Sequence, residues 1–246
     1  MKKKHTIHIG TSGWSYEHWK EKFFPTDLKQ IQWLPYYANT FSTVEVNTTF
    51  YHTPRETTVL NWYNIVPKDF IFSVKMNRYI THNKKLSDCQ DSLGIFYQSI
   101  QPFEKKMGPI LIQLPPKFNA NKERLNEFIH LLNKKHRYTF EFRNETWFTP
   151  EIYEVLKENN IALCITDLRG ELSPEIMTSD FVYIRLHGPK QAYGGSYGPK
   201  KLKEWKKKIE NWLDDASVYC YFDNDEKGYA IQDALVLQKM FKGDDE

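Results

Sequence analysis

The stretch FVYIRLHGPKQAYGGSYGPK, residues 181–200, joins a strand to a glycine-rich loop. Its first residues are aromatic and β-branched, which is typical of a buried strand, yet Arg185 and His187 interrupt the run. Residues two apart in a strand point to the same face, so these two side chains lie opposite Ile184 and Leu186. A buried strand that ends in polar groups and then enters a loop is typical of the carboxyl end of a β/α unit.

Seven other runs share this apolar and β-branched character. The predicted strands are 6–10, 43–47, 70–75, 110–114, 138–143, 162–167, 182–187 and 218–223. Between them lie helical patterns, marked by Leu125, Phe128, Ile129 and Leu132, by Leu202, Trp205, Ile209 and Trp212, and by Pro150 in a first turn. Eight strands alternating with helices in 246 residues, near the roughly 250 typical of such folds, predict an α/β protein with a TIM-like (β/α)8 barrel. A doubly wound open sheet is the alternative.

Composition favours one globular domain over residues 1–246, with 40% hydrophobic and 15% aromatic residues. The net charge of +3 lacks the strong basic bias of a dedicated nucleic-acid-binding protein. Three well-separated cysteines, Cys89, Cys164 and Cys220, indicate a reducing compartment. The basic start leads into no apolar stretch of signal-peptide length, and no window approaches the roughly 18 apolar residues of a membrane span. We therefore expect a cytoplasmic protein without membrane association.

Polar residues recur at the predicted strand ends. Glu45 and Asn47 share one face of their strand, and Glu141 and Arg143 share one face of another. Polar residues also end the other five strands, namely Ser12, Lys75, Gln113, Asp167, and Asp223 or Asn224 for the last strand. In a β/α barrel the carboxyl ends of the strands meet on one rim, where catalytic groups are found. We therefore expect a pocket there, covered by the loop that carries Tyr193 and Tyr197.

The mixed charges predict acid–base chemistry on a small anionic substrate, by a hydrolase or a lyase. Arginine and lysine side chains would hold a phosphate or carboxylate group, and a carboxylate or histidine would move the proton. The predicted catalytic residues are Glu45, Glu141, Asp167 and His187, and the predicted substrate-binding residues are Ser12, Asn47, Lys75, Gln113, Arg143, Arg185, Tyr193, Tyr197, Asp223 and Asn224. For any single member, a structural role as a buried ion pair is an equally good interpretation.

Two other functions stay open. The carboxylates with His187 suit a divalent cation, which would indicate a metal-dependent phosphodiester hydrolase of the endonuclease IV type. Because three cationic side chains share the same strand ends, we predict no metal ligand and no other cofactor, with a divalent metal as the alternative. The six lysines of 200–208, with Tyr193 and Tyr197 as stacking surfaces, would suit a non-catalytic binder of nucleic acid or nucleotide. We expect those lysines to form a solvated helix face instead, and His82 to be an ordinary loop histidine.

Eight motifs follow one another along the chain. They are GTSGW (10–14), TVEVNTTFY (43–51), VKMNRYITH (74–82), ILIQLPPKF (110–118), FEFRNETW (140–147), ITD (165–167), YIRLHG (183–188) and YFDND (221–225). Together they resemble the YecE-like family, also known as domain of unknown function 72, over about residues 7 to 241. The resemblance implies a TIM-barrel-like fold with the motif residues at one site, but no settled reaction or oligomeric state. The chain departs from the family pattern at Asp223, where the family commonly has asparagine.

Overall fold

The computed structural model describes residues 5–243, and these divide into two compact units. The first unit comprises residues up to 44, 165–175 and residues from 180 onward, and the second comprises 45–164 and 176–179. The basic residues 1–4, on which the expectation of no leader segment partly rests, lie outside the described residues.

Every predicted strand is present. The strands are β1 (Ile7–Thr11), β2 (Thr43–Val46), β3 (Ile71–Lys75), β4 (Met107–Gln113), β5 (Tyr138–Glu141), β6 (Ala162–Leu168), β8 (Phe181–Gly188) and β9 (Ser217–Phe222). Their order in the sheet is β1-β9-β8-β6-β5-β4-β3-β2, and the pairs β1–β9, β8–β9, β3–β4, β4–β5 and β5–β6 are parallel. The order follows the chain with β1 next to the last strand, whereas a doubly wound sheet reverses its order midway. The predicted class, α/β with a TIM-like (β/α)8 barrel, is confirmed.

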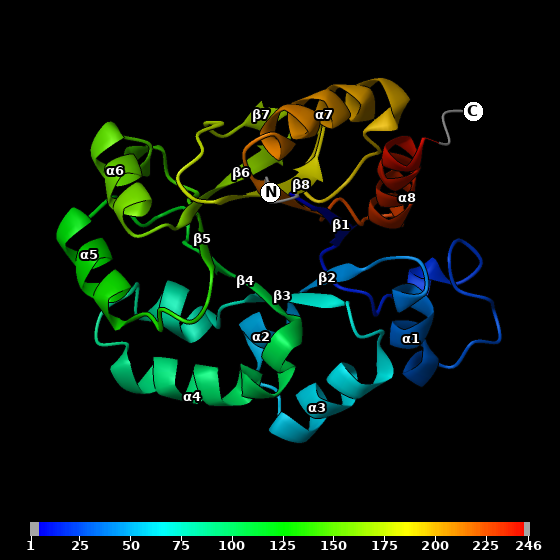
Figure 1. Ribbon diagram of the computed structural model, residues 1–246, viewed down its shortest axis with the longest axis horizontal. Coiled ribbons are helices and arrows are strands. Elements are labelled where there is room, and N and C mark those ends of the chain that lie inside the picture. Colours follow the sequence, from blue (N-terminus) through cyan, green and yellow to red (C-terminus); the bar gives the residue numbers. More distant parts are fainter. Residues whose placement is uncertain (1–4, 244–246) are drawn as a thin grey trace. The chain divides into compact units, whose positions relative to one another are not determined.

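Helices separate most of the strands (Figure 1). They are α1 (Trp33–Ala38), α2 (Thr48–Tyr51), α3 (Glu56–Ile65), α4 (Gln90–Ile100), α5 (Lys122–Leu131), α6 (Pro150–Glu158), α7 (Gly198–Leu213) and α8 (Tyr229–Lys242). After β6 the two-residue strand β7 (Glu171–Leu172) pairs with β6 in antiparallel fashion, in the place where the alternation predicts a helix. No helix within residues 5–243 combines the length and apolar character needed to cross a bilayer.

In the second unit the strands β3, β4 and β5 form a core with the helices around them. Phe128 of α5 packs edge-on against Phe140 of β5, with ring centroids 6.4 Å apart. Beyond the end of β5, Phe142 stacks on Trp147 at 4.8 Å, and the Trp147 indole donates to the Phe118 carbonyl at 2.7 Å. These contacts fix the segment that follows β5, which carries Arg143.

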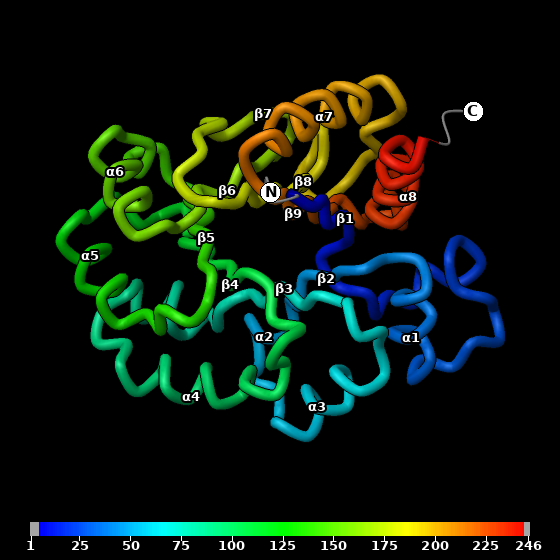
Figure 2. Tube along the Cα trace, viewed as in Figure 1, coloured from blue at the N-terminus to red at the C-terminus, as the bar shows by residue number. Residues whose placement is uncertain are grey.

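In the first unit β1, β9 and β8 run side by side, and helices α7 and α8 contact each other (Figure 2). Helix α7 buries Leu202, Trp205 and Ile209 on the spacing that the sequence predicts. Its Lys208 ammonium lies 5.2 Å from the Trp205 ring centroid, so a lysine stem shields an aromatic side chain as expected.

Candidate functional site

The ends of β4 and β5 hold a buried carboxylate between two donors. The parallel register pairs Gln113 with Glu141, and the Gln113 Nε2 donates to the Glu141 Oε1 at 2.9 Å. The Arg143 Nε forms an ion pair with the same carboxylate oxygen. Glu141 is fully buried, while 11% of the Arg143 side chain is exposed. The carboxylate therefore orients the guanidinium, and the guanidinium is the member of the pair that reaches solvent.

The Lys75 ammonium and the His82 imidazole both contact the ring of Phe50. The Lys75 Nζ lies 4.3 Å from the Phe50 ring centroid, and the His82 imidazole packs edge-on against the same ring at 5.0 Å. The Thr49 hydroxyl donates to the Lys75 carbonyl at 2.7 Å, which ties helix α2 to the end of β3. An ammonium and an imidazole are thus held on one aromatic side chain beside the carboxyl end of β3.

A π-helical turn, Tyr79–Asn83, positions His82. Asn77 starts this turn, because its Oδ1 accepts from the Tyr79 N–H at 2.8 Å and its Nδ2 donates to the Thr49 carbonyl at 3.2 Å. Three non-glycine residues with left-handed backbone follow, Lys85 with φ 48°, Leu86 with φ 70° and Asp88 with φ 50°. Single π-turns and left-handed non-glycine residues concentrate at functional sites, where the surrounding structure compensates their cost.

The electrostatic environment of His82 is net positive. Burial is the largest cause that lowers the pKa of His82, from 6.5 to about 4, and the charges of Lys75, Arg78 and Arg143 lower it further. Among the charges of residues 5–243 that act on it, the Glu141 carboxylate raises this pKa. The imidazole is therefore neutral at pH 7, in surroundings that favour an added negative charge.

A different cluster occupies the strand ends of the first unit. The Arg185 Nη2 lies 3.0 Å from the Asp223 Oδ2 and donates to the Ser12 Oγ at 3.3 Å. The Arg185 Nη1 lies 3.2 Å from the His187 Nε2, and the His187 Nδ1 lies 2.9 Å from the Asp223 Oδ2. Since a guanidinium only donates, the His187 Nε2 is the acceptor in its contact with Arg185. Arg185 and His187 are fully buried, so Asp223, with 15% of its side chain exposed, is the most accessible member of this trio.

Asp167 and Tyr197 belong to a second buried network in the first unit. Asp167 is fully buried and forms an ion pair with Lys201 of α7 at 3.0 Å. The Tyr197 hydroxyl donates to the Asp167 carbonyl at 3.4 Å and accepts from the Gly188 N–H at 3.0 Å. Burial and the nearby Asp167 raise the pKa of Tyr197 above its usual value. These bonds fasten the glycine-tyrosine loop to the ends of β6 and β8.

Asn224 and Asp233 also hold the glycine-tyrosine loop in place through hydrogen bonds. The Asn224 Nδ2 donates to the Gly195 carbonyl at 2.7 Å and to Asp233 at 2.8 Å, and Asp233 also accepts from the Tyr197 N–H at 2.9 Å. Tyr193 behaves differently, because 49% of it is exposed while its ring packs edge-on against His187 at 5.5 Å. Tyr193 is therefore the member of the loop that presents aromatic surface to solvent.

The predicted site residues fall into two sets. Glu45, Asn47, Lys75, Gln113, Glu141 and Arg143 lie in the second unit, and Ser12, Asp167, Arg185, His187, Tyr193, Tyr197, Asp223 and Asn224 lie in the first. Glu45 is fully buried at the end of β2. The Asn47 Oδ1 is also buried, and it accepts no hydrogen bond from the described part of the chain.

Three expectations need correction. Tyr197 is only 6% exposed, so it cannot act as a stacking surface for a nucleic-acid base. Arg185 is ion-paired and buried, so it does not present a two-pronged contact to a ligand at the surface. Lys201 pairs with Asp167 instead of belonging wholly to a solvated helix face.

Arg78 and His82 are not among the site residues that the sequence predicts, and His82 was expected to be an ordinary loop histidine. Both lie in or next to the π-turn, whose irregular hydrogen bonding has no signature in residue spacing. Within residues 5–243, side chains of His, Cys, Asp and Glu form no group of three or more that could hold a metal ion.

Residues 8–246 match the family described as "Protein of unknown function DUF72". The chain belongs to this family. It is 26% identical to the UPF0759 protein YunF of Bacillus subtilis (strain 168), over 95% of this chain and 94% of that protein. It is 31% identical to the UPF0759 protein YecE of Escherichia coli (strain K12), over 58% of this chain and 50% of that protein.

Solved structures of DUF72 proteins resemble it closely. The crystal structure of the family protein TM1631 from Thermotoga maritima MSB8 matches with a TM-score of 0.87 and 29% identity, over 97% of this chain and all of that one. The protein EF0366 from Enterococcus faecalis V583 matches with a TM-score of 0.84 and 22% identity, over 96% of each chain, which shows a shared fold. The predicted resemblance to the YecE-like family is confirmed, and with it the assignment of this DUF72 chain to the TIM-like barrels.

Proposed function

We propose that this DUF72 protein is an enzyme that performs acid–base chemistry on a small anionic substrate bound at the carboxyl ends of β3 and β5. The proposal rests on one observation: the Lys75 ammonium and the His82 imidazole both contact the Phe50 ring. Arg143, oriented by Glu141, supplies a second cation that acts on the same imidazole. A phosphate or carboxylate group is the ligand that such an arrangement favours.

The roles within this site differ from those that the sequence predicts. Glu141 is fully buried and engaged by Gln113 and Arg143, so it serves as a positioning residue for the guanidinium. Lys75 and Arg143 bind the anionic group. His82 takes over the proton-transfer role expected of His187, which is buried against Arg185 and Asp223 in the first unit.

His82 is suited to respond to the substrate. The Thr81 hydroxyl lies 2.9 Å from the His82 Nδ1, so in this proposal the Nε2 is the nitrogen that contacts the substrate. A bound anion offsets the charges of Lys75, Arg78 and Arg143, which lower the pKa of His82 in the free protein. Binding therefore brings that pKa back toward neutrality, where a histidine accepts and donates protons most effectively.

Turnover by a His82→Gln variant tests the proposal. The protein is incubated with a mixture of small phosphorylated and carboxylated metabolites, and product formation is followed by ¹H and ³¹P NMR. We expect the wild-type protein to convert at least one component, and the variant to be slower by about 100-fold or more while its affinity changes little.

His130→Gln is the matched control for this experiment. His130 is an exposed histidine of α5 in the same unit and should keep the wild-type rate. Equal rates for the wild-type protein and the His82→Gln variant would remove His82 from the mechanism. Saturable binding without any conversion would make the site a binding site only.

A further inference from the structure

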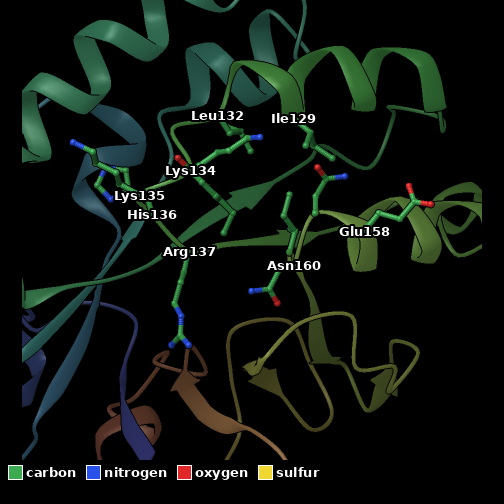
Figure 3. Close-up of a pocket in the computed structure, with 11 residues that line it drawn as sticks. Ile129, Leu132, Lys134, Lys135, His136, Arg137, Glu158 and Asn160 are labelled. Carbon is green, nitrogen blue, oxygen red and sulfur yellow. The ribbon is translucent and has the colours of Figure 1, made fainter.

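A cavity of about 430 Å³ lies in the second unit at the opposite ends of the strands from the candidate site. Its lining comes from the segments that lead into β5 and β6 and from the end of α5 (Figure 3). The lining residues are Ile129, Leu132, Lys134, Lys135, His136, Arg137, Tyr138, Glu158, Asn159, Asn160 and Ile161. The candidate site uses none of them. A volume of this size is in the range of small-molecule pockets, roughly 300–1,000 Å³.

The floor of the cavity is apolar. Ile129 and Leu132 are each 6% exposed, Ile161 is 3% exposed, and Tyr138 is 4% exposed. Figure 3 shows Ile129 and Leu132 reaching from the α5 side toward the strands. An apolar floor of this kind favours a ligand with an aromatic or branched hydrocarbon body.

The rim of the cavity is cationic. Lys134 and Lys135 are exposed, and Glu158 is the single acidic residue of the lining; Figure 3 shows it on the far side of the cavity from Lys135. His136 stacks on Tyr97 with ring centroids 5.5 Å apart, and burial lowers its pKa, so at neutral pH it adds a hydrogen-bonding group and no charge. The lysines complement a negatively charged group at the mouth of the cavity.

The geometry points to a second ligand site, for a small organic anion whose apolar body enters the cavity and whose carboxylate or phosphate group contacts Lys134, with Lys135 adding positive charge to the same rim. A small ligand fits the observations better than a larger partner, because the apolar side chains of the lining are nearly buried and form no broad exposed face. The site is separate from the one proposed for catalysis, so either can fail without the other.

Phenyl phosphate is the probe that tests this site. Methyl NMR of Ile129, Leu132 and Ile161 is recorded during titration, in a Lys75→Met background that disables the candidate catalytic site. We expect saturable shifts of these methyl signals with phenyl phosphate, and no saturable shifts with inorganic phosphate or benzyl alcohol at the same concentrations. A Lys134→Glu, Lys135→Glu variant should weaken binding at least 10-fold.

A second pair of exposed lysines provides the control. Lys203 and Lys207 lie on α7 in the first unit, and charge reversal of both should leave the affinity unchanged. The proposal is overturned if these methyl signals do not respond, if the Lys134 and Lys135 variant binds as well as its parent, or if inorganic phosphate or benzyl alcohol binds as tightly as phenyl phosphate.

Discussion

Replacement of Arg185 by alanine is expected to lower the free energy of unfolding by about 3 kcal/mol, as measured by urea denaturation. The guanidinium is fully buried and lies within 3.3 Å of groups on Ser12, His187 and Asp223. Its removal leaves the Asp223 carboxylate without its main counter-charge. The expected loss of stability lies at the lower end of the range for a buried ion pair that loses one partner, because part of the Asp223 side chain keeps contact with water.

Two variants show whether the loss comes from the ion pair. Lys203→Ala removes an exposed cation from the same unit and should change the free energy of unfolding by less than about 0.5 kcal/mol. A double variant, Arg185→Met with Asp223→Leu, removes both charges and should recover part of the lost stability. If Arg185→Ala unfolds like the wild-type protein but no longer binds small anions, Arg185 is a ligand-binding residue and its structural role is wrong.

Replacement of Lys75 by methionine is expected to weaken the binding of inorganic phosphate at pH 7 by about 10- to 100-fold. One charge-assisted contact contributes about 1.5–3 kcal/mol, which corresponds to this change in Kd. Methionine keeps an apolar stem against Phe50, so the ring contact that positions His82 is preserved. Isothermal titration calorimetry gives the two dissociation constants directly.

Lys68→Met is the matched control for Lys75→Met. Lys68 is an exposed lysine of the second unit that precedes β3, and its loss should leave the Kd for phosphate within twofold. Equal affinities for the wild-type protein and the Lys75→Met variant would show that phosphate binds elsewhere. If circular dichroism shows that the Lys75→Met protein is unfolded, the titration is repeated with Lys75→Gln.

The strands were predictable because each is a short run of mainly apolar and β-branched residues. The polar pairs were predictable because residues two apart share a face. Arg185 and His187 lie in contact, and so do Glu141 and Arg143, as that rule requires. The two-residue strand after β6 was missed, because two residues are too few to show any periodicity.

Individual roles were harder to predict than positions. Burial decides whether a charged side chain meets a ligand or a partner, and a single sequence does not specify which charges neutralise one another. Arg185 is buried and has a carboxylate partner, Asp223, whereas His82 lies in an irregular turn with cationic neighbours. Both residues lie at a strand end or just after one in the sequence. Their different surroundings follow from the packing, which the sequence does not show.

The most direct test of the proposed anion site is the NMR titration of the His82 imidazole with and without saturating sulfate, whose charge stays constant over the pH range involved. In the free protein we expect a pKa of about 4. Bound sulfate should raise that pKa, so that by linkage sulfate binds more tightly as the pH falls from about 6.5 toward 4. An identical pKa in the free and sulfate-saturated protein would contradict the site.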